Sequence, residues 1–151
     1  MKNAIILLIL IQFSIVINAQ EKIDFSLSFN HIALSVKDVT ISAQFYTNVL
    51  NLEIIPLPPE AENVKWISLE DGKELYLLSI FKDEIKTNKA IHLALSTANF
   101  DAFVQKLTAM NVAYTDFLGT LNKINVRPDG INQVFFQDPD VYWIEVNSIS
   151  Q

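Results

Sequence analysis

Hydrophobic and polar residues alternate in two short segments of the chain that share one pattern. The segments are residues 31–35 (HIALS) and residues 92–96 (HLALS), and each opens on one of the only two histidines in the chain. Alternation with a period of two is typical of a β-strand with one buried face. The repeat predicts two similar halves, each beginning with a strand whose histidine faces away from the large aliphatic residues.

A helical pattern follows each of these strands. Asp38 or Thr40 can cap the first helix, and Thr97 or Asn99 can cap the second. The apolar positions expected to face the core are Ile41, Phe45 and Val49 in the first helix and Phe100, Phe103, Val104 and Leu107 in the second.

Each half then returns to strands. In the first half, a hairpin is predicted around Asp71-Gly72, with strands at residues 65–69 and 74–81. In the second half, strands are predicted at residues 133–137 and 142–146, on either side of Asp138-Pro139-Asp140. With one further strand expected in each half, the chain predicts an α+β domain over residues 29–148. Its two βαβββ modules would span about residues 29–81 and 90–148, joined by a polar linker.

The N-terminal segment has a different character. Lys2 precedes an apolar run over residues 4–17, and the small residue Ala19 lies at its exit. This order predicts a signal peptide over residues 1–19, cleaved after Ala19, with a short extension at 20–28 and export to the periplasm or the medium. The rival interpretation is an uncleaved N-terminal anchor, although the run is short of the roughly 20 apolar residues that a membrane span needs.

The amino-acid composition excludes several kinds of site and partner. The chain has no cysteine, which excludes disulfides, thiolate metal sites and a cysteine nucleophile. Its net charge is −6 and Arg127 is its single arginine, so nucleic acid and anionic membrane surfaces are poor partners. We expect a small-molecule substrate and no integral membrane span after cleavage.

Acidic residues on the last strand of each half complete a candidate metal site. Glu74 and Glu145 lie there, and His31 and His92 open the first strands. Two halves related by a pseudo-two-fold axis would bring two imidazoles and two carboxylates around one point. This set suits a single divalent ion such as Zn, Ni, Co, Mn or Fe. The alternative is that the histidines are structural and the glutamates merely solvated.

Other side chains are candidates for substrate binding. Arg127, before Pro128-Asp129-Gly130, is either an anion clamp or a surface arginine. Tyr76 and Trp143 share strand faces with the two glutamates, so they either line the pocket or pack in the core. Asp138 and Asp140 lack enough neighbouring oxygen ligands for calcium and are interpreted as turn residues.

Four segments carry a resemblance to a known family. They are FNHIALSVKDVTISAQFYTNVLNLEII, GKELYLLS, AIHLALSTANFDAFVQKL and VFFQDPDVYWIEVNS. Together they resemble the vicinal-oxygen-chelate superfamily of glyoxalase I, bleomycin-resistance proteins, fosfomycin-resistance enzymes and extradiol dioxygenases. The resemblance implies paired βαβββ modules that form a curved mixed sheet around a metal. It also implies that all four ligand positions of the glyoxalase I type are filled, with Glu145 as the catalytic glutamate and Glu74 able to share that role.

Individual positions discriminate within the superfamily. The carboxylate of Glu74 argues against an iron site with two histidines and one carboxylate, the type that the resemblance to extradiol dioxygenases would imply. Bleomycin-binding members generally lack the metal ligands. Ser35 and Leu78 stand where glyoxalase I has the arginine and asparagine that grip glutathione. Val141 stands where the family's usual turn glycine follows Asp-Pro-Asp.

These observations predict an exported, metal-dependent lyase or isomerase that acts on a small oxygen-rich substrate other than a glutathione conjugate. One alternative is a non-catalytic protein that sequesters a small molecule, and a weaker one is an Fe(II) dioxygenase. The sequence leaves open whether the modules pair within one chain or between two, so a homodimer is one of the expected assemblies.

Overall fold

The computed structural model describes residues 26–80 and 84–149. The expected signal peptide over residues 1–19 lies outside the described residues. The elements in chain order are β1 (His31–Ser35), α1 (Val39–Leu50), β2 (Ile54–Ile55), β3 (Val64–Ser68), β4 (Glu74–Leu78), β5 (His92–Ser96), α2 (Phe100–Ala109), β6 (Asn125–Val126), β7 (Asn132–Gln137) and β8 (Trp143–Asn147). Each half is thus a βαβββ module, as the repeat predicts.

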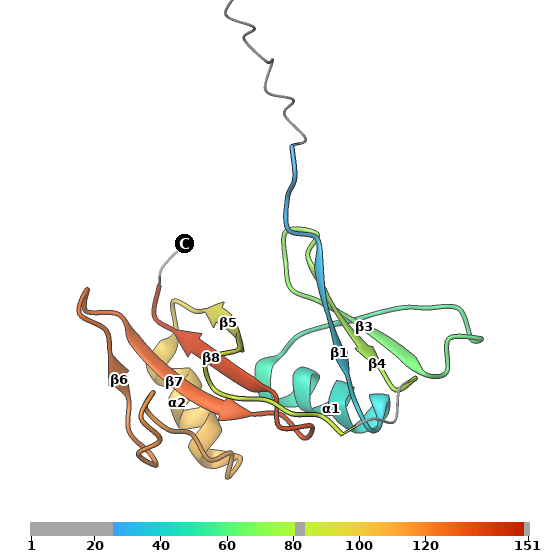
Figure 1. The fold of residues 1–151 in the computed structure, drawn as a ribbon. Coiled ribbons are helices and arrows are strands. Elements are labelled where there is room, and N and C mark those ends of the chain that lie inside the picture. The colour runs from blue at the N-terminus through green and yellow to red at the C-terminus, as the bar shows by residue number, and fades with distance from the viewer. Residues whose placement is uncertain (1–25, 81–83, 150–151) are drawn as a thin grey trace, which may run out of the picture.

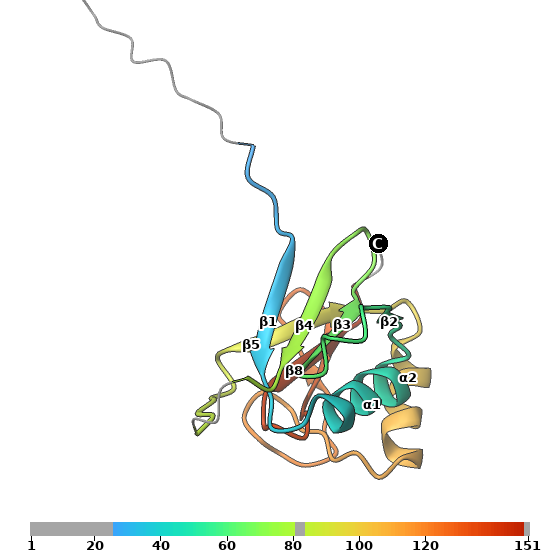
Figure 2. The same cartoon turned by 90° about the vertical axis from the view of Figure 1, so that its right-hand side faces the viewer.

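The strands form two four-stranded sheets with the same topology. Their orders are β1-β4-β3-β2 and β5-β8-β7-β6. The first strand of each half runs parallel to the last, and the other pairs are antiparallel. Figures 1 and 2 show one sheet and one helix in each half. The α+β class and the paired modules are therefore confirmed.

A single apolar core joins the two halves. The aliphatic face of each first strand turns toward it, as the alternation predicts, and both helices contribute to it. The largest fully buried side chains are Tyr46, Phe135, Phe136, Ile67, Leu75, Leu77, Leu107 and Ile144. Burial of this much apolar surface is the main force that holds the halves together.

Helix α1 begins where the sequence indicates, and of its three predicted core positions Val49 is buried, Phe45 packs against the core and Ile41 does not. The Asp38 carboxylate accepts hydrogen bonds from the N–H groups of Thr40 and Ile41, at 2.7 and 3.1 Å, so Asp38 is the cap. The prediction that Ile41 faces the core is wrong, because its side chain is 55% exposed. Besides Val49, the buried face carries Val39, Ser42, Ala43 and Tyr46.

Helix α2 follows its predicted pattern. Phe100 and Leu107 are buried, and Phe103 and Val104 pack against the core. Asn99 occupies the cap position without a side-chain cap bond, while the Thr97 hydroxyl accepts a hydrogen bond from the Asn99 N–H at 3.1 Å.

A polar contact explains the face that α1 buries. Tyr46 and Ser42 donate hydrogen bonds to the carboxylates of Asp138 and Asp140, at 3.0 and 2.7 Å, in the turn between β7 and β8. The Lys37 N–H donates to Asp140 as well, at 2.9 Å. These aspartates do form the predicted turn, but they are also buried anchors that fix the helix of one half onto the strands of the other.

Each sheet has one edge formed by its first strand and another formed by its short second strand, β2 or β6. β1 and β5 are end strands of their sheets, and each is paired on one side only. Such an edge presents unpaired backbone groups to a neighbouring strand. In the part of the chain that the structure describes, neither helix has the length and apolar character to cross a membrane.

Candidate metal centre

The first half brings one histidine and one glutamate to the same face of its sheet. His31 on β1 lies opposite Glu74 on the parallel strand β4. The His31 Nδ1 atom lies 2.7 Å from the Asn30 Oδ1 atom, and the Tyr76 hydroxyl donates a hydrogen bond of 2.7 Å to Glu74 Oε2. His31 is exposed and Glu74 is half-buried, so this face is open.

The second half brings its histidine and glutamate into direct contact. The His92 Nε2 atom lies 3.2 Å from Glu145 Oε2. The Asn147 amide donates a hydrogen bond of 2.8 Å to the other oxygen of Glu145. Glu145 is buried, with 7% of its side chain exposed, whereas 23% of the His92 side chain is exposed.

The hydrogen bond on the far side of the His92 ring sets the chemistry of this pair. The Nδ1 atom lies 2.8 Å from the Lys89 carbonyl oxygen, which can only accept, so Nδ1 carries the proton. In the neutral ring, Nε2 then points a lone pair at the Glu145 carboxylate. Two acceptors at this separation repel each other unless a cation lies between them, either a proton or a metal ion.

The separation itself fits a metal. Two ligands that are each about 2.1 Å from one ion and roughly at right angles lie about 3 Å apart. The 3.2 Å between His92 Nε2 and Glu145 Oε2 is close to this separation. A carbonyl that orients a ligating histidine is also the usual second partner in such sites. The residues present therefore fit a divalent ion.

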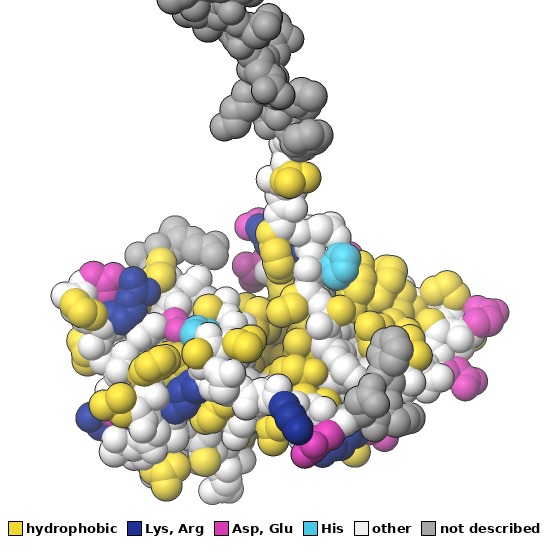
Figure 3. Space-filling view, in the orientation of Figure 1, with side chains coloured by type: hydrophobic (Ala, Val, Ile, Leu, Met, Phe, Trp, Pro, Cys, Tyr) yellow, Lys and Arg dark blue, Asp and Glu magenta, His cyan; other side chains and the backbone are white. Residues whose placement is uncertain are grey.

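The four predicted ligands do not meet within one chain. Among residues 26–80 and 84–149, no three histidine or acidic side chains are close enough to hold a metal together. The two histidines reach the surface at separate places in the space-filling view (Figure 3). Each half therefore carries one candidate histidine and one candidate glutamate, and within one chain the two pairs lie too far apart to bind one ion together.

The same segments match a known family along most of the chain. The family model of the Glyoxalase/Bleomycin resistance protein/Dioxygenase superfamily matches residues 28–146. The chain belongs to this superfamily. A relative from Bacillus subtilis (strain 168), Uncharacterized protein YwbC, is 27% identical over 122 residues, which is 77% of this chain and 93% of that protein.

Solved structures share the fold of this superfamily member. A protein from Bacillus anthracis, described as belonging to the glyoxalase family, has a TM-score of 0.66 at 19% identity and covers 83% of this chain and 98% of its own. The lactoylglutathione lyase of Agrobacterium tumefaciens has a TM-score of 0.59 at 18% identity, over 80% of this chain and 92% of its own. At such low identity the likeness shows the fold, and the reaction must be argued from the site.

Two positions where this chain departs from glyoxalase I lie side by side. Ser35 on β1 is the register partner of Leu78 on β4. Both lie on the face that carries His31 and Glu74, at the other end of the two strands. One end of this face therefore presents a hydroxyl and an isobutyl group at the two positions that resemble the glutathione-binding positions of glyoxalase I.

The aromatic candidates both lie on ligand faces, whereas Arg127 is engaged elsewhere. Tyr76 contacts His31 and Glu74, and Trp143 is the register partner of His92. Arg127 follows β6, the strand at the far edge of the second sheet, and its guanidinium lies 2.6 Å from the Asp129 carboxylate. This local ion pair competes with the predicted role of Arg127 as an anion clamp.

Lys89 is a site residue that the sequence pattern does not reveal. Its ammonium lies 4.4 Å from the centroid of the Trp143 ring and donates hydrogen bonds to the Thr115 hydroxyl and the Asp116 carbonyl, at 2.8 and 3.0 Å. Partial burial lowers the pKa of this ammonium. The only signal in the sequence is a lysine three residues before His92, which is too common to single out.

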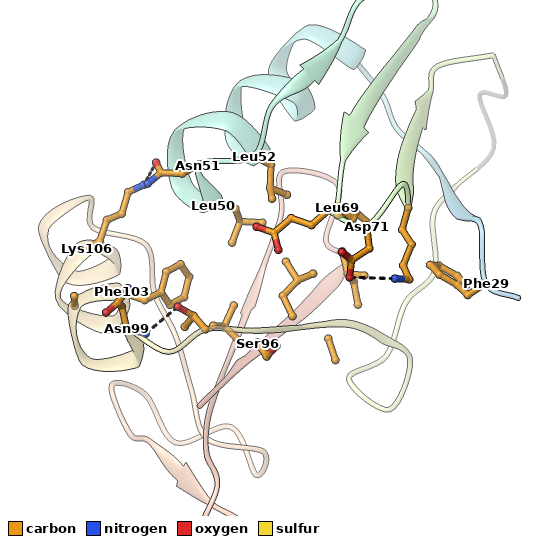
Figure 4. A pocket seen from close by; sticks show the side chains of 18 residues that line it. Phe29, Leu50, Asn51, Leu52, Leu69, Asp71, Ser96, Asn99, Phe103 and Lys106 are labelled. Atoms are coloured by element: carbon orange, nitrogen blue, oxygen red, sulfur yellow. Dashed lines mark hydrogen bonds and ion pairs between the residues drawn. The ribbon is translucent and has the colours of Figure 1, made fainter. Parts of the chain in front are cut away.

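A large cleft lies away from these residues. It has a volume of about 690 Å³ and lies between the two halves, with leucines and Phe103 on its walls (Figure 4). Lys106 and Asn51 close one end through a hydrogen bond of 2.6 Å. None of the predicted ligands or substrate-binding residues lines it.

Proposed function

We propose that this chain is an exported, metal-dependent lyase or isomerase that acts on a small oxygen-rich substrate other than a glutathione conjugate. The observation that carries the proposal is the buried contact of His92 with Glu145, in which two electron-pair donors face each other at a distance that suits one cation. His31 and Glu74 would supply a second histidine and carboxylate from the first half, where they are register partners. Zn, Ni, Co, Mn and Fe all suit this ligand set.

We further infer that the four ligands come together between two copies of the chain. One copy offers the open edge of β1, and the other offers the open edge of β5. Pairing these edges would join a first-half sheet to a second-half sheet. His31 and Glu74 of one copy would then face His92 and Glu145 of the other, and a symmetric dimer would have two such sites.

The side chains around Glu145 favour it as the general base. A bound metal would supply Lewis-acid polarisation of a substrate carbonyl oxygen. Asn147 holds one carboxylate oxygen of Glu145, which leaves Oε2 oriented toward the site. The carboxylate is buried, so a substrate would meet a base with few competing waters. Glu145 would take a proton from the carbon next to the polarised carbonyl.

Mixing two defective variants tests both the metal site and its location. His31→Ala and His92→Ala should each bind metal weakly as separate proteins. If the site lies between copies, a heterodimer of the two variants has one intact site and one site that lacks both histidines. Unfolding and refolding the mixture should therefore restore tight binding at about one site in four, since half of the dimers are mixed. Calorimetric titration with Ni²⁺ or Zn²⁺ measures this.

A mixture of His31→Ala with Glu74→Ala is the matched control. Both changes lie in the first half, so every site in the mixed dimer lacks one ligand and no tight site should return. If the wild type binds metal tightly but neither mixture regains tight binding, the site lies within one chain. No metal binding by the wild type would overturn the proposal. Metal binding without turnover of any small hydroxy-carbonyl compound would favour the sequestration function.

A further inference from the structure

We propose that Tyr76 is a positioning residue that holds both metal-binding side chains of the first half at once. The proposal rests on the metal-dependent function proposed above. It gives Tyr76 a role different from the substrate contact that the sequence suggests.

Three rings on adjacent strands fix the plane of the His31 imidazole. The His31 ring stacks on Tyr76 with centroids 4.2 Å apart and planes 15° from parallel. Tyr76 in turn stacks on Trp66, with centroids 4.5 Å apart and planes 13° from parallel. Trp66 on β3 is the register partner of Tyr76, so the indole supports the phenol from behind. Stacked rings of this kind attract one another and resist rotation.

The hydroxyl of the same phenol fixes the carboxylate. It donates a hydrogen bond of 2.7 Å to Glu74 Oε2, and the two residues lie two positions apart on one face of β4. Tyr76 therefore contacts the imidazole with its ring and the carboxylate with its hydroxyl. A metal that binds this pair would find both donors already oriented, with less rotamer freedom to lose on binding.

The second half divides the same task between two residues. The Asn147 amide holds Glu145 and the Lys89 carbonyl holds His92, each through a hydrogen bond of 2.8 Å. Asn147 follows Glu145 by two residues, just as Tyr76 follows Glu74. Each glutamate thus has a hydrogen-bond donor two residues after it, although Tyr76 pairs with Ala33 and Asn147 with Ser96, so the two donors are not at equivalent register positions.

Two substitutions separate the contributions of the ring and the hydroxyl. Tyr76→Phe keeps the ring stack but removes the hydrogen bond to Glu74, whereas Tyr76→Leu removes both. Loss of a partner that orients a metal ligand typically weakens metal binding about 10–100-fold. We expect about a 10-fold loss of Ni²⁺ affinity for Tyr76→Phe and about a 100-fold loss for Tyr76→Leu, measured by calorimetry. Tyr142→Phe is the matched control, because its hydroxyl donates to the Ser35 carbonyl rather than to a ligand.

A second readout needs no metal. The chain has two histidines, so its imidazole protons give two sets of NMR signals, assigned with His31→Gln. Stacking on Tyr76 should shift the His31 protons upfield. That shift should persist in Tyr76→Phe and disappear in Tyr76→Leu. Wild-type affinity and unchanged imidazole shifts in both variants would overturn the positioning role while leaving the proposed function intact. A wild type that binds no metal would overturn both proposals, whatever the NMR spectrum shows.

Discussion

The phenol of Tyr46 in the first half donates a hydrogen bond of 3.0 Å to the carboxylate of Asp138 in the second half. Asp138 is 5% exposed, and it also accepts hydrogen bonds from the N–H groups of Asp140 and Tyr142. Burial raises the pKa of Asp138 to about 6, although these hydrogen bonds favour the charged form. The contact between the halves is therefore sensitive to pH.

The stability of wild type relative to Asp138→Asn should depend on pH. Asp138 binds its proton more tightly in the folded state than in the unfolded state, so its contribution to stability is fully present below about pH 4 and is lost as the pH rises through about 6. The difference in unfolding free energy, wild type minus variant, should fall by on the order of 2–3 kcal/mol between pH 4 and pH 7. Urea unfolding of both proteins measures it, and parallel pH profiles would contradict the prediction.

Val141 occupies a backbone conformation that suits glycine. Its φ angle is 64°, which is strained for a β-branched residue, and its carbonyl accepts hydrogen bonds from Thr87 and Gln137 that hold the turn in place. Val141→Gly should relieve about 1–3 kcal/mol of strain. It should also cost about 0.5–1 kcal/mol, because glycine gives the unfolded chain more conformational entropy to lose on folding. We expect the free energy of unfolding to rise by about 1 kcal/mol, and Val141→Ala to gain less. A loss of stability in the glycine variant would show that the side chain matters more than the backbone.

Ser35 and Leu78 predict that glutathione conjugates are not substrates. The two residues are register partners on the ligand face, and the Leu78 side chain has no group that can form a hydrogen bond. The metal-loaded protein should show no efficient turnover of the glutathione adduct of methylglyoxal. Glyoxalase I serves as the positive control in the same absorbance assay. Efficient turnover by this protein would refute the prediction.

Glu145→Gln separates an enzyme from a binding protein. Glutamine keeps an oxygen that can accept the Asn147 hydrogen bond and contact a metal, but it cannot take a proton at neutral pH. Once a substrate is found, turnover should fall by about 10²–10⁴, while metal affinity falls only modestly. Steady-state kinetics and metal titration on the same preparations measure both. A variant with full rate would make Glu74 the next candidate for the base, with Glu74→Gln as its test.

The predicted signal peptide implies a defined mature terminus. Lys2, the apolar run over residues 4–17 and Ala19 together predict cleavage after Ala19. Mass spectrometry of protein recovered from the native envelope or medium should show a chain that begins at Gln20. An intact Met1 in that fraction would support the uncleaved anchor.

Local patterns in the sequence were sufficient to predict most of the secondary structure. The hairpin around Asp71-Gly72 lies between β3 and β4, and α2 buries the apolar positions that its spacing indicates. These features are predictable because strand alternation, helical spacing and turn chemistry depend on residues a few positions apart. The repeated histidine segments also predicted that the two halves share one topology.

The buried face of α1 depended on residues distant in the sequence. Ile41 looks like a core residue by spacing, yet it is exposed, while Ser42 and Tyr46 are buried. Burial of their hydroxyl groups is favourable only because each hydroxyl donates a hydrogen bond to a carboxylate of the other half, Ser42 to Asp140 and Tyr46 to Asp138. Helical periodicity alone contains no information about such a partner.

The same distinction holds for the candidate metal centre. The sequence by itself predicted His31, Glu74, His92 and Glu145 as candidate ligands, because strand alternation is local and places each on a predictable strand face. The tertiary structure decided which of them meet. His92 contacts Glu145 because β5 and β8 are neighbours in one sheet, whereas the two halves belong to separate sheets that keep their ligand pairs apart. Strand pairing determines which side chains become neighbours, and it is set by packing between distant parts of the chain.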